Sequence, residues 1–210
     1  MISRIVIDST DAKTELCELG KICGTDKSPY NTVRHRHPYT AVYSILLASL
    51  KNMPILFAEI GVATGNSAIL WDLYFTNPDT RIRMFDRDES FLDNARNMTC
   101  SRCSYGLMDV SVDGDVARGL GDGLYDVIID DSSHEHGHQI RIIKEAWPRL
   151  KSGGILIVED IFRSTAEKEY SDAIPEILSG AAAAYFVVCE HAARWSPGWD
   201  NDKLLVLVKG

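Results

Sequence analysis

The chain has 210 residues, the length of one α/β domain and too short for two full domains. Hydrophobic residues make up 45% of it and charged residues 25%, which excludes wholesale disorder and a fibrous repeat. With 22 basic and 30 acidic residues, the formal net charge of −8 gives no bulk attraction toward nucleic acid or an anionic membrane. We therefore expect neither of these as a partner.

Targeting signals and cysteine usage favour a cytoplasmic protein. The longest apolar stretch, residues 41–50, is too short to span a bilayer, and residues 1–16 lack the apolar core of a signal peptide. The five cysteines are odd in number and scattered, which is typical of reduced thiols. Cys100 and Cys103 form a C-x-x-C pair, but without a second ligand pair a zinc or redox role is disfavoured.

The N-terminal quarter differs from the rest of the chain. Residues 1–52 contain two predicted helices, at about 11–23 and 39–50, joined by a loop rich in glycine and charge. No linker separates them from the remaining residues. We expect residues 1–52 to form a short helical cap on a core of residues 53–210.

Short apolar runs alternate with longer amphipathic segments in the core. Helices are predicted between the runs. This alternation predicts a doubly wound α/β fold with a mainly parallel sheet. Since no helix separates the last two runs, one of them is expected to be antiparallel. The predicted strands are 55–60, 81–85, 105–108, 126–129, 155–158, 185–188 and 204–208, and the helices are 65–75, 89–97, 136–150 and 166–178.

Polar residues collect at the ends of the predicted strands, where open α/β sheets bind ligands. The first strand ends in Glu59-x-Gly61-x-x-x-Gly65, and the second ends at Asp86, about twenty residues on. Glycines let a backbone approach a ligand closely, and a carboxylate at this spacing is typical of one that binds ribose hydroxyls. The combination predicts a nucleoside site.

The glycine pattern indicates which nucleoside is bound. It departs from the G-x-G-x-x-G of dinucleotide folds, so a dehydrogenase is the weaker interpretation. Over residues 55–208 the chain instead resembles the class I S-adenosylmethionine-dependent methyltransferases. This resemblance implies a seven-stranded, mostly parallel sheet with a reversed last strand, S-adenosylmethionine as cofactor, and an acidic residue that ends the second strand.

A narrower resemblance rests on four blocks in order. The blocks are Gly24-Thr25-Asp26-Lys27, His37-Pro38-Tyr39-Thr40-x-x-Tyr43, 129–134 (I-D-D-S-S-H) and Val158-Glu159-Asp160. They resemble blocks of the macrocin and mycinamicin sugar O-methyltransferases, and cephalosporin hydroxylase-like proteins share several of them. Ser132 stands where that family usually has glycine. The resemblance implies Mg²⁺ and methylation of a sugar hydroxyl of a natural product.

Three carboxylates are expected to gather at two neighbouring strand ends. Asp131, Glu159 and Asp160 would repel one another and raise their pKa values without a cation. Mg²⁺ prefers such oxygen ligands and stabilises the alkoxide that a sugar hydroxyl must become. The resemblance places metal ligands at these three positions. A helix cap by residues 130–133 is the alternative, but it leaves Glu159-Asp160 unexplained.

A histidine near this cluster is the candidate base. His134 follows Asp131 by three residues, and histidine accepts a proton near neutral pH. The resemblance implies that His134 is the general base and that Asp131 shares in catalysis. His136 and His138 are more typical of a helix surface, although His138 lies one helical turn from His134.

Further residues are expected to bind the cofactor. Asp109 follows the third strand, where methyltransferases often place a polar residue at the adenine. Thr25 and Lys27 are expected to close over the cofactor or substrate, unless they form a simple turn between two helices. Asp130 is expected to bind the cofactor together with Glu59, Gly61, Gly65 and Asp86.

Three features are open to two interpretations. The basic run Arg34-His35-Arg36-His37 is typical of a solvated loop but also suits an anionic substrate. Trp195 and Trp199 lie in a Pro/Gly loop and either stack on a sugar or pack on the core. Tyr39 and Tyr43 are expected to be packing residues.

The sequence thus predicts a Mg²⁺-assisted S-adenosylmethionine-dependent O-methyltransferase acting on a sugar or glycosylated metabolite. A metal-dependent catechol-type O-methyltransferase uses the same carboxylates and is the first alternative. A non-catalytic S-adenosylmethionine-binding partner protein is the second. A homo-oligomer is plausible, but no interface is readable in the sequence.

Overall fold

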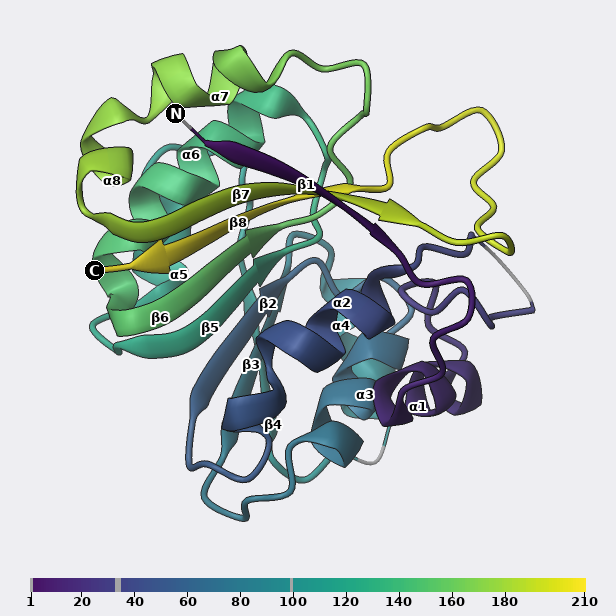
Figure 1. Cartoon of the computed structure of the whole chain (residues 1–210). Helices are drawn as coiled ribbons and strands as arrows, with labels where there is room; N and C mark the ends of the chain where they lie inside the picture. The colour runs from purple at the N-terminus through teal and green to yellow at the C-terminus, as the bar shows by residue number, and fades with distance from the viewer. Residues whose placement is uncertain (1, 33–34, 99) are drawn as a thin grey trace.

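The structure is a computed structural model that describes residues 2–32, 35–98 and 100–210. One sheet runs through it in the strand order β1-β7-β8-β6-β5-β2-β3-β4 (Figure 1). Neighbouring strands are parallel except at β8, which is antiparallel to both β6 and β7. The strands are β1 (Ser3–Asp8), β2 (Leu56–Ile60), β3 (Arg81–Asp86), β4 (Cys103–Leu107), β5 (Tyr125–Asp130), β6 (Leu150–Val158), β7 (Ala181–Glu190) and β8 (Lys203–Lys209).

Helices cover both faces of the sheet and divide the apolar core into two clusters. The first cluster lies under α1 to α4 and centres on Trp71, Tyr39 and Phe57. The second lies under α5 to α8 and centres on Ile143, Phe186 and neighbouring sheet residues. The helices are α1 (Glu15–Cys23), α2 (Tyr39–Leu46), α3 (Asn66–Tyr74), α4 (Glu89–Arg96), α5 (Asp115–Leu120), α6 (His136–Ala146), α7 (Glu167–Ala173) and α8 (Pro175–Ser179), with 3-10 turns at Ala48–Leu50 and Trp147–Arg149.

The predicted doubly wound, mostly parallel architecture is confirmed, and so is the antiparallel strand near the C-terminus. The sheet has eight strands rather than seven, because residues 3–8 add an edge strand parallel to β7. Their run Ile5-Val6-Ile7 is β-branched, which favours a strand. Residues 1–52 are therefore not purely helical, and their division from the core at residue 53 remains a prediction.

Other element bounds differ from the sequence predictions. The helix expected at 166–178 is two helices, because Pro175 follows Ile174, which leaves the helical region with ψ 41°. Residues 151–154, which separate the predicted helix 136–150 from the predicted strand 155–158, belong to β6, and α5 was not predicted. The polar stretch around α5 has too few apolar positions to show a helical period.

Cys100 and Cys103 form a disulfide, with Cα atoms 5.5 Å apart. This corrects the expectation of free thiols for these two residues. The turn before β4 brings them within the separation that a disulfide requires. Cys17, Cys23 and Cys189 are free. None of the described helices has the length and apolar character needed to cross a membrane.

Candidate active site

The register of β2, β5 and β6 creates the site. Ile60 pairs with Asp130, and Asp130 pairs with Val158, so these three strands end side by side. The next residue of each strand is held by its neighbour: the Asp131 amide donates to Ile60 O (2.8 Å), and the Glu159 amide donates to Asp130 O (2.9 Å). Residues far apart in the sequence thus share the carboxyl edge of the sheet, where α/β folds bind ligands.

Gly61 is required by the close approach of β5. Its φ is 109°, and a Cβ atom placed on it would lie 1.9 Å from the carbonyl oxygen of Asp131. No other residue type fits this contact. Gly65, with φ 78°, starts α3 and faces the Ala95 side of α4. The loop between them therefore turns sharply at the end of β2 and exposes its backbone.

Asp86 fixes this loop from the end of β3. Its Oδ2 accepts the amides of Val62 (2.8 Å) and Ala63 (3.2 Å), and its Oδ1 accepts the amide of Asp88 (3.0 Å). Ala63 has φ 44°, a conformation that non-glycine residues rarely adopt. The carboxylate that the sequence assigned to ribose binding thus also holds the glycine loop in shape.

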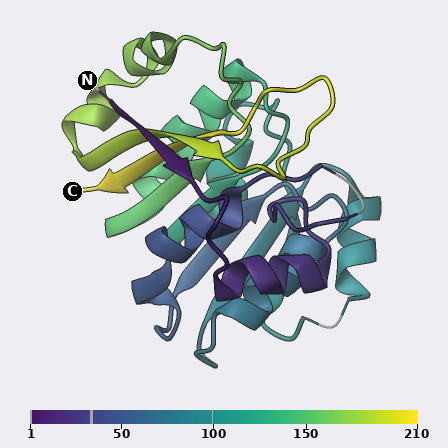
Figure 2. The ribbon, with the colours of Figure 1, turned by 45° about the vertical axis from the view of Figure 1, so that its right-hand side comes forward.

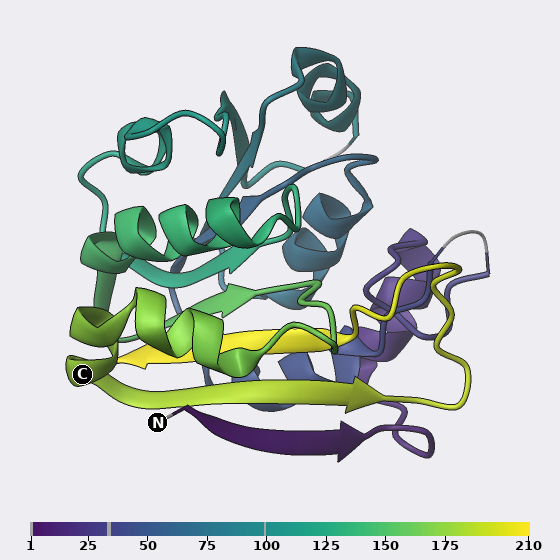
Figure 3. The same ribbon diagram turned by 90° about the horizontal axis from the view of Figure 1, so that it is seen from above.

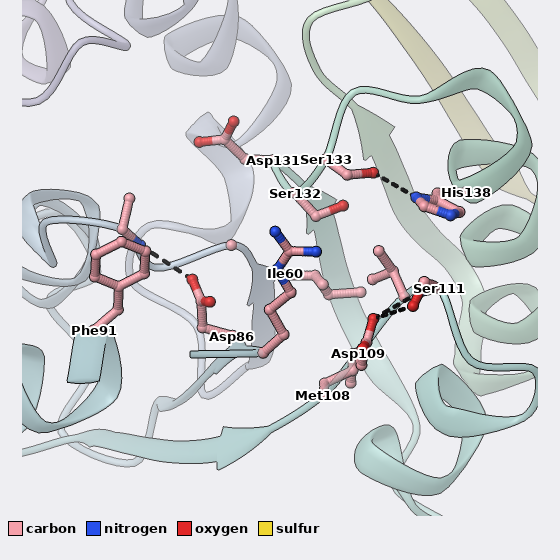
Figure 4. Close-up of a pocket in the computed structure, with 14 residues that line it drawn as sticks. Ile60, Asp86, Phe91, Met108, Asp109, Ser111, Asp131, Ser132, Ser133 and His138 are labelled. Atoms are coloured by element: carbon pink, nitrogen blue, oxygen red, sulfur yellow. Dashed lines mark hydrogen bonds between the residues drawn. The ribbon is translucent and has the colours of Figure 1, made fainter. Parts of the chain in front are cut away.

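A pocket opens beside this loop (Figure 4). Asp86, Asp109 and Asp131 line it together with the apolar side chains of Phe91 and Met108. Asp109 Oδ1 accepts hydrogen bonds from the hydroxyl (2.7 Å) and amide (2.9 Å) of Ser111, and these bonds lower the pKa of Asp109. A slot with apolar walls and oriented carboxylates suits a nucleoside. Gly61, Asp86 and Asp109 therefore lie together as the sequence predicted.

Five predicted cofactor residues do not line the pocket. One of them, Gly65, lies at the start of α3. Thr25, Lys27, Glu59 and Asp130 are all nearly inaccessible to solvent and point elsewhere. Asp130 Oδ1 accepts the hydroxyl of Ser132 (2.6 Å), and burial raises the pKa of Asp130 to about 6. Their roles in cofactor binding stay predictions, because in this structure these residues lie behind the pocket.

A buried ion cluster lies behind the pocket. The Lys27 ammonium lies 2.5 Å from Asp131 Oδ2, 2.8 Å from Glu159 Oε2 and 3.0 Å from Glu59 Oε1. Burial disfavours the charge of Lys27, but the three carboxylates outweigh it and raise the Lys27 pKa well above its usual value. Burial raises the pKa of Glu159 well above its usual range, and Lys27 opposes that rise. Glu59 also accepts a bond from Trp71 Nε1 (2.7 Å).

A second polar group shares Asp131 with this cluster. Asp131, His134 and Asp160 offer ligand atoms within 4.8 Å of one another. His134 Nε2 lies 3.5 Å from Asp160 Oδ2, and the Tyr39 hydroxyl donates to Asp160 Oδ1 (2.6 Å). His134 (φ 59°) and Asp160 (φ 56°) both hold left-handed backbone conformations. Such strain concentrates at functional sites.

The donor set fits a hard divalent cation. Four carboxylates, those of Glu59, Asp131, Glu159 and Asp160, lie beside two cationic side chains, Lys27 and His37, so negative charge is in excess. Asp131 and Asp160 point to one place together with His134. Glu159, predicted as the third ligand, binds Lys27 and accepts the Tyr43 hydroxyl, and it also offers a ligand atom within 4.8 Å of those of Asp131 and Glu59. A metal role for Glu159 requires these contacts to rearrange.

Aromatic side chains stand on the solvent side of His134. Trp199, which is 45% exposed, lies edge-on to His134 with ring centroids 6.2 Å apart, and Phe162 lies 5.7 Å from Trp199. The loop before β8 reaches this place and meets the loop before α2, where Arg36 and Trp195 form an isolated antiparallel bridge (Figure 2). Trp199 thus lies near the candidate base, Trp195 lies beside His35, and neither belongs to the core.

The basic run does not form one anionic-ligand surface. His37 turns inward and bonds Asp202 Oδ1 (2.8 Å), and the Arg36 guanidinium lies over the Trp195 ring. Arg34 lies outside the described residues. Burial disfavours protonation of His37, but Asp160 and Asp202 outweigh it and raise the His37 pKa to about 9.

Sequence reasoning missed several supporting residues. Tyr39 and Tyr43, expected to be packing residues, also donate hydrogen bonds to Asp160 and Glu159. Their i, i+4 spacing beside the HPYT block was the available signal. Gln139 also supports the site, because its Nε2 donates to Glu159 O (3.0 Å). No local sequence pattern marks Gln139 or Asp202 as a site residue, because only the folded sheet brings them to the site.

Comparison with known proteins shows which domain and which solved structures the chain resembles. Residues 58–161 match the family of the methyltransferase domain. Among solved structures, the MycE methyltransferase of the mycinamycin biosynthetic pathway, in complex with Mg and SAH, superposes with a TM-score of 0.67 at 21% identity, over 94% of this chain and 55% of that chain. A putative O-methyltransferase from Klebsiella pneumoniae gives a TM-score of 0.60 at 14% identity, over 94% and 91%. Residues 58–161 therefore match a methyltransferase domain, and the structure has the Rossmann-like methyltransferase fold.

Curated relatives show which group of methyltransferases the sequence resembles. The 8-demethyl-8-(2-methoxy-alpha-L-rhamnosyl)-tetracenomycin-C 3'-O-methyltransferase of Streptomyces olivaceus is 29% identical over 60% of this chain and 33% of its own length. The L-olivosyl-oleandolide 3-O-methyltransferase of Streptomyces antibioticus is 30% identical over 61% and 33%. The chain thus spans about a third of the length of these relatives. The resemblance to the sugar O-methyltransferase group, predicted from the four blocks, is confirmed.

Proposed function

We propose that this chain transfers the methyl group of S-adenosylmethionine to a hydroxyl of a sugar or glycosylated metabolite, assisted by Mg²⁺. One observation carries the proposal. Asp131 lines the nucleoside-type pocket and also belongs to the Asp131–His134–Asp160 group, so a bound cofactor and an activated hydroxyl would meet at one side chain. Methyl transfer needs this proximity. The matched relatives, named as sugar O-methyltransferases, support the acceptor class.

Different residues would bind the cofactor and the cation. Asp86 and Asp109 would hold the nucleoside between Phe91 and Met108, and the glycine loop would lie against it. Asp131, Glu159 and Asp160 would hold the cation. When bound, Mg²⁺ lowers the pKa of a coordinated hydroxyl and stabilises its conjugate base.

His134 would accept the hydroxyl proton at Nε2. Asp160, whose Oδ2 lies 3.5 Å from Nε2, would stabilise the imidazolium that forms. The oxygen then attacks the methyl carbon as the carbon–sulfur bond breaks, which leaves S-adenosylhomocysteine and a methyl ether. Trp199 and Phe162 offer apolar faces for a sugar ring next to this atom.

Calorimetric titration tests the proposal. S-adenosylmethionine and S-adenosylhomocysteine should bind the wild type, and Mg²⁺ should give a separate signal that Asp131→Ala abolishes. A rhamnosylated tetracenomycin and a catechol are then compared as acceptors by mass spectrometry. Product from the catechol alone would favour the catechol-type alternative. Cofactor binding without any product would favour a non-catalytic binding protein, and absence of cofactor binding would refute the proposal.

We also propose that the protein acts in the cytoplasm on a small-molecule acceptor. Three of the five cysteines, Cys17, Cys23 and Cys189, are free, which supports a cytoplasmic site of action, whereas the Cys100–Cys103 disulfide counts against one. The net charge of −8 supports a small-molecule acceptor rather than nucleic acid or a membrane.

A further inference from the structure

Strand β1 forms a free edge of the sheet. It pairs only with β7, and Figure 3 shows it as the border of the molecule, with none of the described helices beyond it. Ile5 is 40% exposed and Val6 is 62% exposed. Edge strands are usually protected by proline, lysine or a bulge, because their free backbone groups pair readily with another strand. Residues 3–8 contain neither proline nor lysine, and their register with β7 is unbroken.

The backbone groups that face outward can be identified. The Ser9 amide donates to Glu190 O (2.9 Å), so Ser9 faces β7. Backbone groups alternate along a strand, so Ile7 and Ile5 also face β7. The N–H and C=O groups of Arg4, Val6 and Asp8 therefore point away from the sheet, and they need a partner in water or in another chain.

We propose that β1 pairs antiparallel with β1 of a second copy of this chain, about a two-fold axis at Val6. This register sets Val6 opposite Val6 of the second copy, and Arg4 opposite Asp8 of the second copy. Every outward-facing residue then meets an outward-facing residue, which is the requirement for hydrogen-bonded pairs in an antiparallel ladder. Ile5 faces Ile7 of the second copy on the other side of the sheet.

Charge complementarity selects this register. Arg4 and Asp8 lie on the same face of β1 as Val6, at equal distances on either side of it. The antiparallel pairing centred on Val6 therefore forms two Arg–Asp pairs. A parallel in-register pairing sets Arg4 beside Arg4, and an antiparallel shift of two residues places both Arg4 and Asp8 opposite uncharged residues. Like charges directly opposite are unfavourable, and a two-fold contact closes on itself.

Both charged side chains can make the contact. The side chain of Arg4 is 56% exposed, and its Nε lies 3.6 Å from Glu167, which leaves its terminal nitrogens free to reach across. Asp8 is exposed, and its Oδ1 accepts the amide (2.9 Å) and hydroxyl (2.6 Å) of Thr10. Oδ2 takes no part in these two bonds. The pairing joins two eight-stranded sheets and removes one free edge from each.

Sedimentation equilibrium over a concentration series tests the pairing. The wild type should approach twice the mass of the chain. Val6→Pro should be monomeric, because it removes an outward N–H and leaves the bonds to β7 intact. Arg4→Asp and Asp8→Arg should each weaken the dimer at least tenfold, and the double variant Arg4→Asp/Asp8→Arg should restore it. Arg96→Asp, with the same charge change on exposed α4, is the control and should not alter the mass.

Each result decides the question. Rescue by the double variant supports both the strand and the register, even if one single variant folds poorly. A wild type that is monomeric at every concentration overturns the proposal. A dimer unaffected by Val6→Pro and by both charge reversals also overturns it, because the contact must then use another surface. These outcomes do not depend on the methyltransferase activity.

Discussion

His134 and Asp160 face each other with Nε2 and Oδ2 3.5 Å apart, and both hold left-handed backbone conformations, with φ 59° and 56°. They come from the turns after β5 and β6, two adjacent parallel strands. A left-handed conformation costs a non-glycine residue about 1–2 kcal/mol. The fold therefore stores strain at the two side chains that we assign to proton transfer and cation binding.

The strain at His134 can be measured. His134→Gly should be more stable than His134→Ala by about 1 kcal/mol, because glycine adopts this conformation without a Cβ penalty. Urea unfolding gives the difference. Both variants should lose about 10²- to 10⁴-fold in kcat while still binding S-adenosylmethionine, if His134 is the base. Equal stability of the two variants would contradict the strain argument, and full activity would contradict the role as base.

Lys27 should be a strong stability determinant in the absence of metal. Lys27→Met leaves Glu59, Asp131 and Glu159 without their shared cation and should cost about 3–5 kcal/mol in urea unfolding at neutral pH. The loss should shrink as the pH falls, because Glu59 and Glu159, whose pKa values burial raises above those of an unfolded chain, become protonated.

Lys51→Met is the matched control for Lys27→Met. Lys51 pairs with Glu15 at the surface, so its loss should cost less than about 1 kcal/mol. Added Mg²⁺ should recover part of the stability of Lys27→Met by binding the folded state. A Lys27→Met protein as stable as the control would contradict the ion cluster.

His37 should make stability fall at alkaline pH. Its pKa is raised to about 9 in the folded state, from about 6.5 in an unfolded chain. Its contribution of about 3 kcal/mol is complete below pH 6.5, declines between 6.5 and 9, and is lost above 9.

The measurement compares wild type with His37→Gln in metal-free urea unfolding across this pH range. The difference between them should be large near pH 6 and small above pH 9. His35→Gln is the control, since His35 is only half-buried and bonds the Ser196 hydroxyl rather than a carboxylate. A difference independent of pH would show that His37 is not charged in the folded protein.

Two substitutions of Asp86 test whether its support of the glycine loop contributes to cofactor binding. Asp86→Ala removes the acceptor for the Val62 and Ala63 amides and should raise the Kd for S-adenosylmethionine about 10- to 100-fold. Asp86→Asn keeps an acceptor for those amides and should bind the cofactor better than Asp86→Ala. Calorimetry measures both, with exposed Asp79→Ala as the control. Wild-type affinity in Asp86→Ala would exclude this pocket as the cofactor site.

Trp199 should contribute to binding of the acceptor and not to binding of the cofactor. Trp199→Ala should raise the KM for a glycosylated acceptor several-fold through loss of an aromatic face, while the Kd for S-adenosylmethionine stays unchanged. Trp147→Ala, on the far side of the sheet near β6, is a comparison that should leave this KM unchanged. An unchanged KM in Trp199→Ala would remove the aromatic wall from the acceptor site.

The alternation of strands and helices, the glycine loop after β2 and the carboxylates at the strand ends could all be predicted from the amino-acid sequence. These features are local, because hydrophobic periodicity and turn chemistry depend on neighbours in the chain. Only the three-dimensional fold brings Lys27 into the carboxylate cluster, sets His37 against Asp202, and makes residues 3–8 an edge strand. Those contacts join segments more than a hundred residues apart, and sheet register and side-chain burial set them rather than any local pattern.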